Sequence, residues 1–422
     1  MKGRQHPTNE VTLNPSRDNE SIRDVIARVE PSRRTFLKGS VGAGVVAALG
    51  GVGLGLAPRE ASAHGVRPGP GFAGIGFASV PPNRLNPSTG LLEKDLVTVP
   101  RGYRAEVLVA WGDPVVRGAP AWDVSAQQDA AAQEGQSGMH HDGMHYFQFR
   151  RRGRGRFGDD RGLLCVNHEY TDEAQLHGFE GLTGGSGVTI AKVRKSQAAH
   201  GVSVQEVVQT GRGWKVRRNS RFGRRITANT PMRVSGPAAG NALLKSKRFA
   251  IDISGSYDTG TTNDGYTAFG TANNCANGYT PWGTYLTCEE NWNGYFGAPT
   301  NGVEIAPELI DQKPEILAGR SRYGISTTGF GYRWHEADPR WNADTNPLEP
   351  NLFGWVVEID PFDPQSAPVK RTALGRMKHE SAQVVVDDDR YVAFYMGDDE
   401  RNEYVYKFVC ARPMEARRGE DD

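Results

Sequence analysis

The sequence lacks a dominant charge, because 50 Lys and Arg residues face 49 Asp and Glu residues and the net charge is only +1. No overall electrostatic field therefore favours a nucleic acid or an acidic membrane surface as a partner. One local basic run, Arg150 to Arg156, lies between two strand-like segments. We interpret this run as the solvated tip of a hairpin.

Long segments with apolar residues at every 3.6 positions are scarce after residue 60, which argues against a helical protein. The 52 glycines and 25 prolines favour a turn-rich, all-β fold instead. Short strands are predicted at 104–111, 145–150, 163–170, 188–194, 284–289, 354–359, 382–386, 391–396 and 404–409. The last three form a meander of the kind found in a propeller blade, but no repeat period is visible.

The N-terminal segment has the three parts of a signal peptide in order. Arg33 and Arg34 precede the mildly apolar run from Gly39 to Ala57, and Ala61-Ser62-Ala63 closes it. A membrane anchor is the alternative, but the run is rich in glycine and barely long enough to span a bilayer. We predict a twin-arginine signal peptide at 1–63, cleaved after Ala63, and a mature domain at 64–422.

This signal predicts passage through the twin-arginine translocase to the periplasm or the medium, without a stable membrane anchor. The twin-arginine route carries proteins that have already folded, which matters most when a cofactor is inserted in the cytoplasm. The route itself therefore raises the expectation of a metal or another cofactor.

The densest group of reactive residues starts at Cys275 on a Gly-rich turn and runs into a strand that ends at Glu289 and Glu290. A thiol and two carboxylates can converge on one cation site. Carboxylates suit hard ions such as calcium, whereas a thiolate favours a transition metal, so the mixture suggests more than one metal. The alternative is that Cys275 is a small buried hydrophobic residue or half of a disulfide.

Carboxylates recur at other strand ends, namely at Glu169, at Glu380 and in the segment from Asp398 to Glu400. Each alone is compatible with a solvated turn, but together they could line the channel of a radial array of sheets, where cations would offset their repulsion. The three histidines between Met139 and His145 are interpreted as a polar turn rather than a metal site. The sequence has no nucleophile elbow, phosphate-binding Gly-rich loop or zinc-protease helix.

Taken together, several segments resemble the PhoX family of alkaline phosphatases. They are Val97 to Tyr103, Trp111 to Pro114, Asn167 to Tyr170, Ile226 to Gly240, Cys275 to Glu290, Arg376 to Glu380 and Gly397 to Tyr404. The resemblance implies a multi-bladed β-propeller whose central site holds a pair of ferric ions (Fe3+) together with calcium ions (Ca2+). It also implies hydrolysis of small phosphate monoesters by Lewis-acid catalysis.

Residue by residue, the resemblance implies that Cys275 bridges the irons and that Glu380 is an iron ligand. The candidates that it implies for the remaining iron and calcium contacts are Glu169, Glu289, Glu290, Asp398 and Glu403. Assigning Cys275 to the metals leaves Cys165, Cys288 and Cys410, which permit at most one disulfide.

Members of this family extend beyond the equivalent of residue 422, so the resemblance implies an incomplete propeller that lacks later active-site groups. We therefore expect exposed strand edges, low stability and doubtful activity for the isolated chain. A noncatalytic, calcium-binding propeller that binds ligands is a second reading. A third is a propeller hydrolase that acts on esters or lactones with calcium alone, but the thiol of Cys275 argues against it.

Overall fold

The structure is a computed structural model, which describes residues 80–89, 96–100, 103–123, 128–149, 160–178, 180–211, 213–252 and 255–415. The chain divides into two compact units, residues 1–105 and residues 106–422. In the first unit, the Asn83 side chain donates to the Leu96 carbonyl and accepts from the Thr98 hydroxyl. The predicted signal peptide at 1–63 and the basic run from Arg150 to Arg156 lie outside the described residues.

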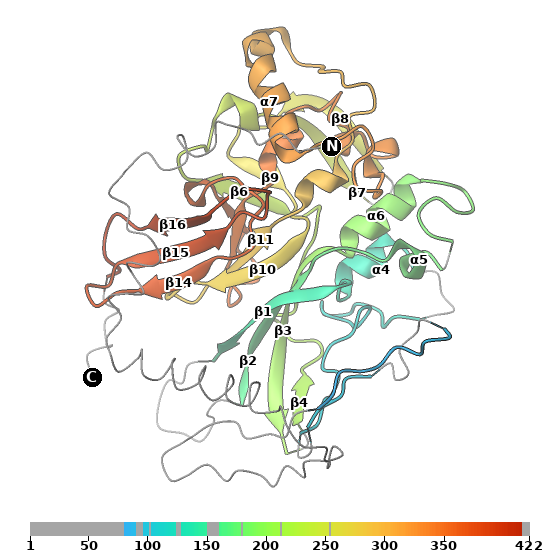
Figure 1. Cartoon of the computed structure of the whole chain (residues 1–422), viewed down its shortest axis with the longest axis vertical. Coiled ribbons are helices and arrows are strands. Elements are labelled where there is room, and N and C mark those ends of the chain that lie inside the picture. Colours follow the sequence, from blue (N-terminus) through green and yellow to red (C-terminus); the bar gives the residue numbers. More distant parts are fainter. Residues whose placement is uncertain are drawn as a thin grey trace, which may run out of the picture. The chain divides into compact units, whose positions relative to one another are not determined.

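The second unit is mostly β-sheet, in line with the predicted fold class (Figure 1). Its first sheet has the order β1-β2-β3-β4, and β5 also pairs with β3, all antiparallel. The bounds are β1 (His141–Gln148), β2 (Arg161–His168), β3 (Gly201–Thr210), β4 (Gly213–Val216) and β5 (Arg224–Ile226).

The second sheet has the order β10-β11-β12-β13-β6-β9, and only its β13–β6 pair is parallel. A third sheet has the order β14-β15-β16, and β7 pairs with β8. The bounds are β6 (Pro231–Ser235), β7 (Lys247–Asp252), β8 (Gly255–Thr262), β9 (Thr267–Phe269), β10 (Asn274–Tyr279), β11 (Tyr285–Glu289), β12 (Val356–Ile359), β13 (Val369–Arg371), β14 (Gln383–Val386), β15 (Val392–Gly397) and β16 (Val405–Val409).

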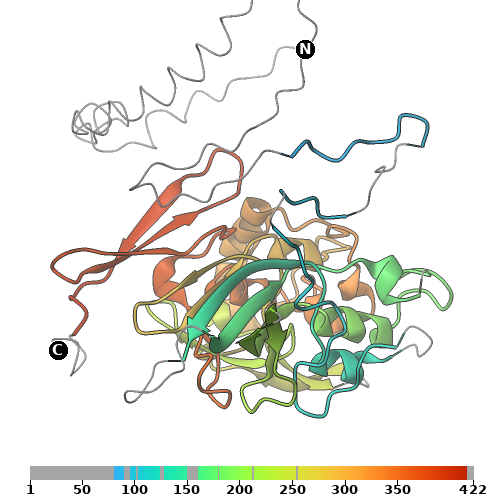
Figure 2. The same ribbon diagram turned by 90° about the horizontal axis from the view of Figure 1, so that it is seen from below.

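Three antiparallel meanders, which begin at β1, β10 and β14, meet at their first strands. Strand β10 contacts both β1 and β14, and an isolated bridge joins Gly278 to Ala382. The sheet β14–β16 lies beside β10 and β11 in Figure 1, and Figure 2 shows it at one side of the other sheets. Within the described residues, the sheets do not close into a barrel or a propeller.

The helices are short, and all but the first of those described lie between strands in the chain. The α-helices are α4 (Ala130–Gly135), α5 (Glu173–Leu176), α6 (Ile190–Ala198) and α7 (Lys313–Tyr323). The 3-10 helices are η1 (Ala242–Leu244), η2 (Trp292–Tyr295), η3 (Pro307–Gln312), η4 (Trp334–Glu336), η5 (Pro339–Trp341), η6 (Glu349–Leu352) and η7 (Thr372–Leu374). None of the helices in the described part of the chain is long and apolar enough to cross a membrane.

Two predicted strands are wrong. Residues 188–194 contain the start of α6, because the Thr189 hydroxyl caps the helix by accepting from the Lys192 amide at 3.3 Å. Residues 104–111 form no strand, and the Val107 side chain is 85% exposed. The other seven predicted strands are confirmed to within a few residues, by β1, β2, β11, β12, β14, β15 and β16. Strand β3, which is the centre of the first sheet, was not predicted.

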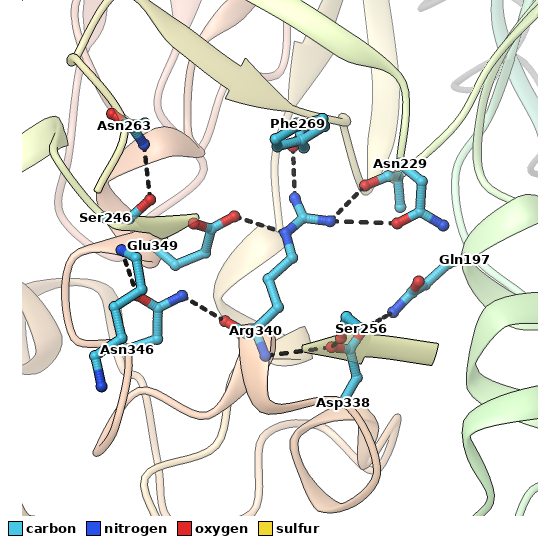
Figure 3. Close-up of polar contacts among 12 residues, drawn as sticks. Gln197, Asn229, Ser246, Ser256, Asn263, Phe269, Asp338, Arg340, Asn346 and Glu349 are labelled. Carbon is cyan, nitrogen blue, oxygen red and sulfur yellow. Dashed lines mark hydrogen bonds and ion pairs between the residues drawn. The ribbon is translucent and has the colours of Figure 1, made fainter. Parts of the chain in front are cut away.

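The core of the second unit is rich in aromatic rings, including Trp334 and Trp341, whose ring centroids lie 4.7 Å apart. The buried guanidinium of Arg340 lies over the Trp341 ring and bonds to the Glu349 carboxylate at 2.7 Å. It also donates to the backbone carbonyls of Phe269 (Figure 3) and Ala228. Because every charge in this set has a partner, the loops around η5 are held firmly to the second sheet.

Candidate metal centre

Three residues from different parts of the second unit bring a thiol and two carboxylates together. Cys275 lies on β10, Glu290 directly follows β11, and Glu380 precedes β14. Their candidate ligand atoms all lie within 4.8 Å of one another. The Cys275 and Glu290 side chains are buried and that of Glu380 is exposed, so the group lies at the edge of the core and can be reached from solvent.

The three meanders position these residues in the same way. At one end of each meander the first strand pairs with the second, through His141 and His168, through Asn274 and Glu289, and through the isolated bridge of His379 and Asp398. The residue after each paired position carries a thiol or a carboxylate. These six residues are Asp142 and Glu169, Cys275 and Glu290, and Glu380 and Asp399.

One backbone hydrogen bond repeats in all three meanders. The amides of Glu169, Glu290 and Asp399 each donate at 3.0 Å. Their respective acceptors are the carbonyls of His140, Asn273 and Lys378. The same backbone hydrogen bond therefore fixes the strand ends of all three meanders. These ends carry the three pairs of side chains, which include the converging residues Cys275, Glu290 and Glu380.

His140 and Asn273 adopt left-handed backbone conformations, with φ of 45° and 53°. Such values are uncommon outside glycine and are best tolerated by Asn, Asp and His. The Asn273 side chain stabilises its turn, because its Oδ1 accepts from the Asn291 amide at 2.6 Å. Residue type at these two positions, whose carbonyls accept from the amides of Glu169 and Glu290, therefore supports the bends that precede Asp142 and Cys275.

The carboxylates of the centre repel one another. Burial raises the pKa of Glu169 to about 7, and the nearby Asp142 and Glu290 carboxylates add to the rise. Burial also raises the pKa of Glu290 to about 7, with Glu380 as the largest charged contributor. For Glu380, burial raises the pKa, with contributions from Asp399 and Asp142. A bound cation is the kind of group that would offset this repulsion.

The environment of the Cys275 thiol favours its protonated form when no metal is bound. Burial raises its pKa, and the nearby Cys288 and Glu290 raise it further. The Sγ donates to the carbonyl of His379 at 3.4 Å. A metal that bound here would have to displace this proton, since the thiolate is the metal ligand. All four cysteines are free, so the structure has no disulfide among them.

The structure places the other predicted ligands in ion pairs. The Glu289 carboxylate lies 2.6 Å from Lys370 Nζ and accepts from the amides of Gly354 and Trp355. Asp398 and Glu403 lie 3.1 Å and 3.0 Å from the Arg322 guanidinium. Cys275, Glu290 and Glu380 therefore converge, and Glu169 lies near enough for Glu290 and Glu380 to raise its pKa. Glu289, Asp398 and Glu403 instead have basic partners.

Two further acidic residues follow the paired strand-end positions, Asp142 and Asp399, and they were not among the predicted ligands. Asp142 lies in the histidine-rich segment that was interpreted as a polar turn, and Asp399 follows a residue that was predicted. The pairing of the strand ends, which only the sheet register reveals, identifies both. Each of the neighbouring histidines packs against a different ring. The distances between ring centroids are 3.7 Å for His140 and Tyr170, 4.9 Å for His141 and His168, and 4.1 Å for His145 and Tyr279.

The chain is similar to known phosphatases along most of its length. A family profile described as alkaline phosphatase PhoX matches residues 85–422, and a twin-arginine translocation signal matches residues 30–50. A solved structure of Pseudomonas fluorescens PhoX in complex with vanadate, a transition state analogue, is 42% identical, with a TM-score of 0.64. The match covers 75% of this chain and 49% of that one, so this chain spans about half of its length. No curated protein matches the chain.

Proposed function

Because this chain belongs to the PhoX family of alkaline phosphatases, we propose that it releases inorganic phosphate from small phosphate monoesters in a metal-dependent reaction. The observation that carries this proposal is the convergence of Cys275, Glu290 and Glu380, whose ligand atoms lie within 4.8 Å of one another. The 42% identity to a phosphatase solved with a transition state analogue supports it.

The metals that we propose are a pair of ferric ions together with calcium. The donor set fits both kinds of ion, because a thiolate favours transition metals and clustered carboxylates suit calcium. In this proposal, Cys275 and Glu380 would hold the iron. The acidic residues that we assign to the remaining contacts are Asp142, Glu169, Glu290 and Asp399.

The three remaining candidate ligands, Glu289, Asp398 and Glu403, are assigned a structural role rather than metal binding. Glu289, Asp398 and Glu403 would each have to leave an ion pair with Lys370 or Arg322 before binding a metal. Breaking a buried pair is costly, most of all for Glu289, whose side chain and that of Lys370 are fully buried. These residues therefore hold the strand ends that carry the ligands.

Bound iron and calcium would supply positive charge that stabilises the phosphoryl oxygens in the transition state. The chain's own residues would hold these ions. The backbone hydrogen bonds that repeat at the three strand ends fix the positions of the residues that carry the ligand atoms. The raised pKa values of Glu169 and Glu290, both about 7, mean that this ligand set is fully ionised only above neutral pH. This favours metal binding, and hence turnover, under alkaline conditions.

The architecture that we propose is a β-propeller in which the three meanders are blades. The repeated arrangement at β1–β2, β10–β11 and the start of β14–β15 supports it, since equivalent inner strands line the centre of a propeller. The twin-arginine signal at 30–50 addresses the chain for export to the periplasm or the medium. We propose residues 1–63 as the signal peptide, the translocase as its partner and residues 64–422 as the mature domain.

The test is to produce the full chain with iron and calcium supplied, and then to measure bound metals by elemental analysis beside turnover of p-nitrophenyl phosphate. Cys275→Ala should lose iron and turnover. Cys165→Ala is the matched control, because Cys165 is equally buried but lies within β2. Calcium binding without iron or turnover would contradict the proposal and favour the noncatalytic calcium-binding reading.

A further inference from the structure

The side chain of Asn167, near the end of β2, is completely buried, and both its Nδ2 and its Oδ1 are hydrogen-bonded. Its Nδ2 donates to the carbonyls of Cys275 at 2.8 Å and Ala276 at 3.0 Å. Its Oδ1 accepts from the hydroxyls of Thr287 and Tyr285, each at 2.9 Å. A primary amide has two donor hydrogens and two acceptor lone pairs, so all of its hydrogen-bonding capacity is used.

The bonds to Cys275 and Ala276 lie at an irregularity in the second sheet. The register between β10 and β11 shifts between Asn274 and Asn277, which is a β-bulge. A bulge disrupts the regular ladder and can turn a side chain in a new direction, which is common beside active sites. At this bulge the Asn167 amide, which belongs to another sheet, holds the carbonyl of Cys275 itself and that of the residue after it.

The two sheets approach one another too closely here for an intervening side chain. A Cβ at Gly143, on β1, would lie 2.7 Å from the Cys275 carbonyl and 2.9 Å from Asn167 Nδ2. The Tyr285 hydroxyl closes the same contact, since it lies 2.9 Å from both the Gly143 carbonyl and Asn167 Oδ1. The position of the Cys275 backbone is therefore set from the first sheet.

We propose that Asn167 is a positioning residue, which holds the bulge so that the Cys275 thiol faces Glu290 and Glu380. The inference rests on the proposed function in so far as the thiol serves as a metal ligand. Groups that orient a metal ligand without touching the metal commonly change metal affinity by about 10- to 100-fold when they are replaced.

Asn167→Asp and Asn167→Ala test this role. Aspartate keeps the shape of the side chain but has no amide hydrogens for the two carbonyls. Both variants should bind iron about ten-fold or more weakly than the parent, and the visible absorption of the iron–thiolate bond should shift. In the metal-free protein, a maleimide should modify Cys275 faster than in the parent, as read by peptide mass spectrometry.

Asn346→Asp is the matched control. Asn346 is 1% exposed, its Nδ2 donates to the Arg340 carbonyl (Figure 3), and its Oδ1 accepts from the Lys247 amide. This variant should lose stability like the Asn167 variants but keep parental iron affinity, absorption and Cys275 modification. Parental iron affinity and parental Cys275 modification in both Asn167 variants would overturn the proposal.

Two further results are also decisive. If the parent binds no iron, the proposed function fails, and the inference about Asn167 is then judged by the rate of Cys275 modification alone. A faster rate in the Asn167 variants than in Asn346→Asp supports the inference, and an equal rate refutes it. If the Asn167 variants do not fold, Thr287→Val, which removes one of the two hydroxyls on Oδ1, is measured in their place by the same criterion.

Discussion

The ammonium group of Lys370 lies 2.6 Å from the carboxylate of Glu289, and both side chains are completely buried. The next residue, Glu290, belongs to the acidic centre instead. Successive side chains of a strand point to opposite faces, so two adjacent glutamates can have different environments. Glu289 stabilises the strand end from within the core, whereas Glu290 faces the candidate metals.

Glu289→Gln should lower the free energy of unfolding by about 3–5 kcal/mol, because it leaves the Lys370 ammonium buried without a counter-charge. Urea unfolding of the metal-free protein, followed by tryptophan fluorescence, measures the loss. The double variant Glu289→Gln with Lys370→Met should recover part of it, since no unpaired charge remains. Parental stability combined with loss of bound metal would instead make Glu289 a ligand.

Glu290→Gln should reduce bound metal while leaving the metal-free protein at least as stable as the parent at alkaline pH, because it removes one of several repelling carboxylates. Elemental analysis and thermal unfolding measure the two effects. The control is Glu304→Gln, whose carboxylate is exposed and pairs with Lys247 at 3.0 Å. Equal metal contents in the two variants would remove Glu290 from the ligand set.

The metal-free protein should lose stability as the pH rises through about 7. The pKa values of Glu169 and Glu290 are raised to about 7 in the folded protein from an ordinary value of 4.5. The folded state therefore binds protons more tightly than the unfolded state. The resulting stabilisation is fully present below pH 4.5 and is lost as the pH rises through about 7. Urea unfolding between about pH 5 and pH 8 measures the slope.

The matched variant for this experiment is Glu290→Gln, which should flatten the pH dependence because one of the two titrating groups is gone. Calcium should also flatten it, since a bound cation removes the repulsion that proton binding relieves. A parental curve with no slope in this range would show that the two carboxyl groups titrate normally.

Maleimide should modify Cys410 before the other three cysteines. Cys165, Cys275 and Cys288 are buried, whereas Cys410 is only partly buried, and burial raises the pKa of each thiol. Addition of iron should slow the modification of Cys275 selectively, because coordination blocks the sulfur. Equal rates at Cys275 with and without iron would contradict its assignment as a ligand.

Much of the β-structure was predictable because it depends on local patterns. The segments that became β2, β11 and the meander β14–β16 combine strand-forming residues with turn residues on either side, and these strands were found. The run from Val188 to Arg194 looks similar, yet the Thr189 cap turns it into the start of α6. The central strand β3 was missed.

The sequence alone determined the family, the twin-arginine signal and the residue types of the centre, since Cys275 could be recognised on a Gly-rich turn and Glu290 and Glu380 beside predicted strands. Only the tertiary structure decided which carboxylates belong together. The register of the three meanders adds Asp142 and Asp399, and the pairing with Lys370 separates Glu289 from Glu290. The reason is physical. The sequence specifies which side chains could bind a metal, whereas strand register and burial determine which of them come together and which charges are neutralised by a partner.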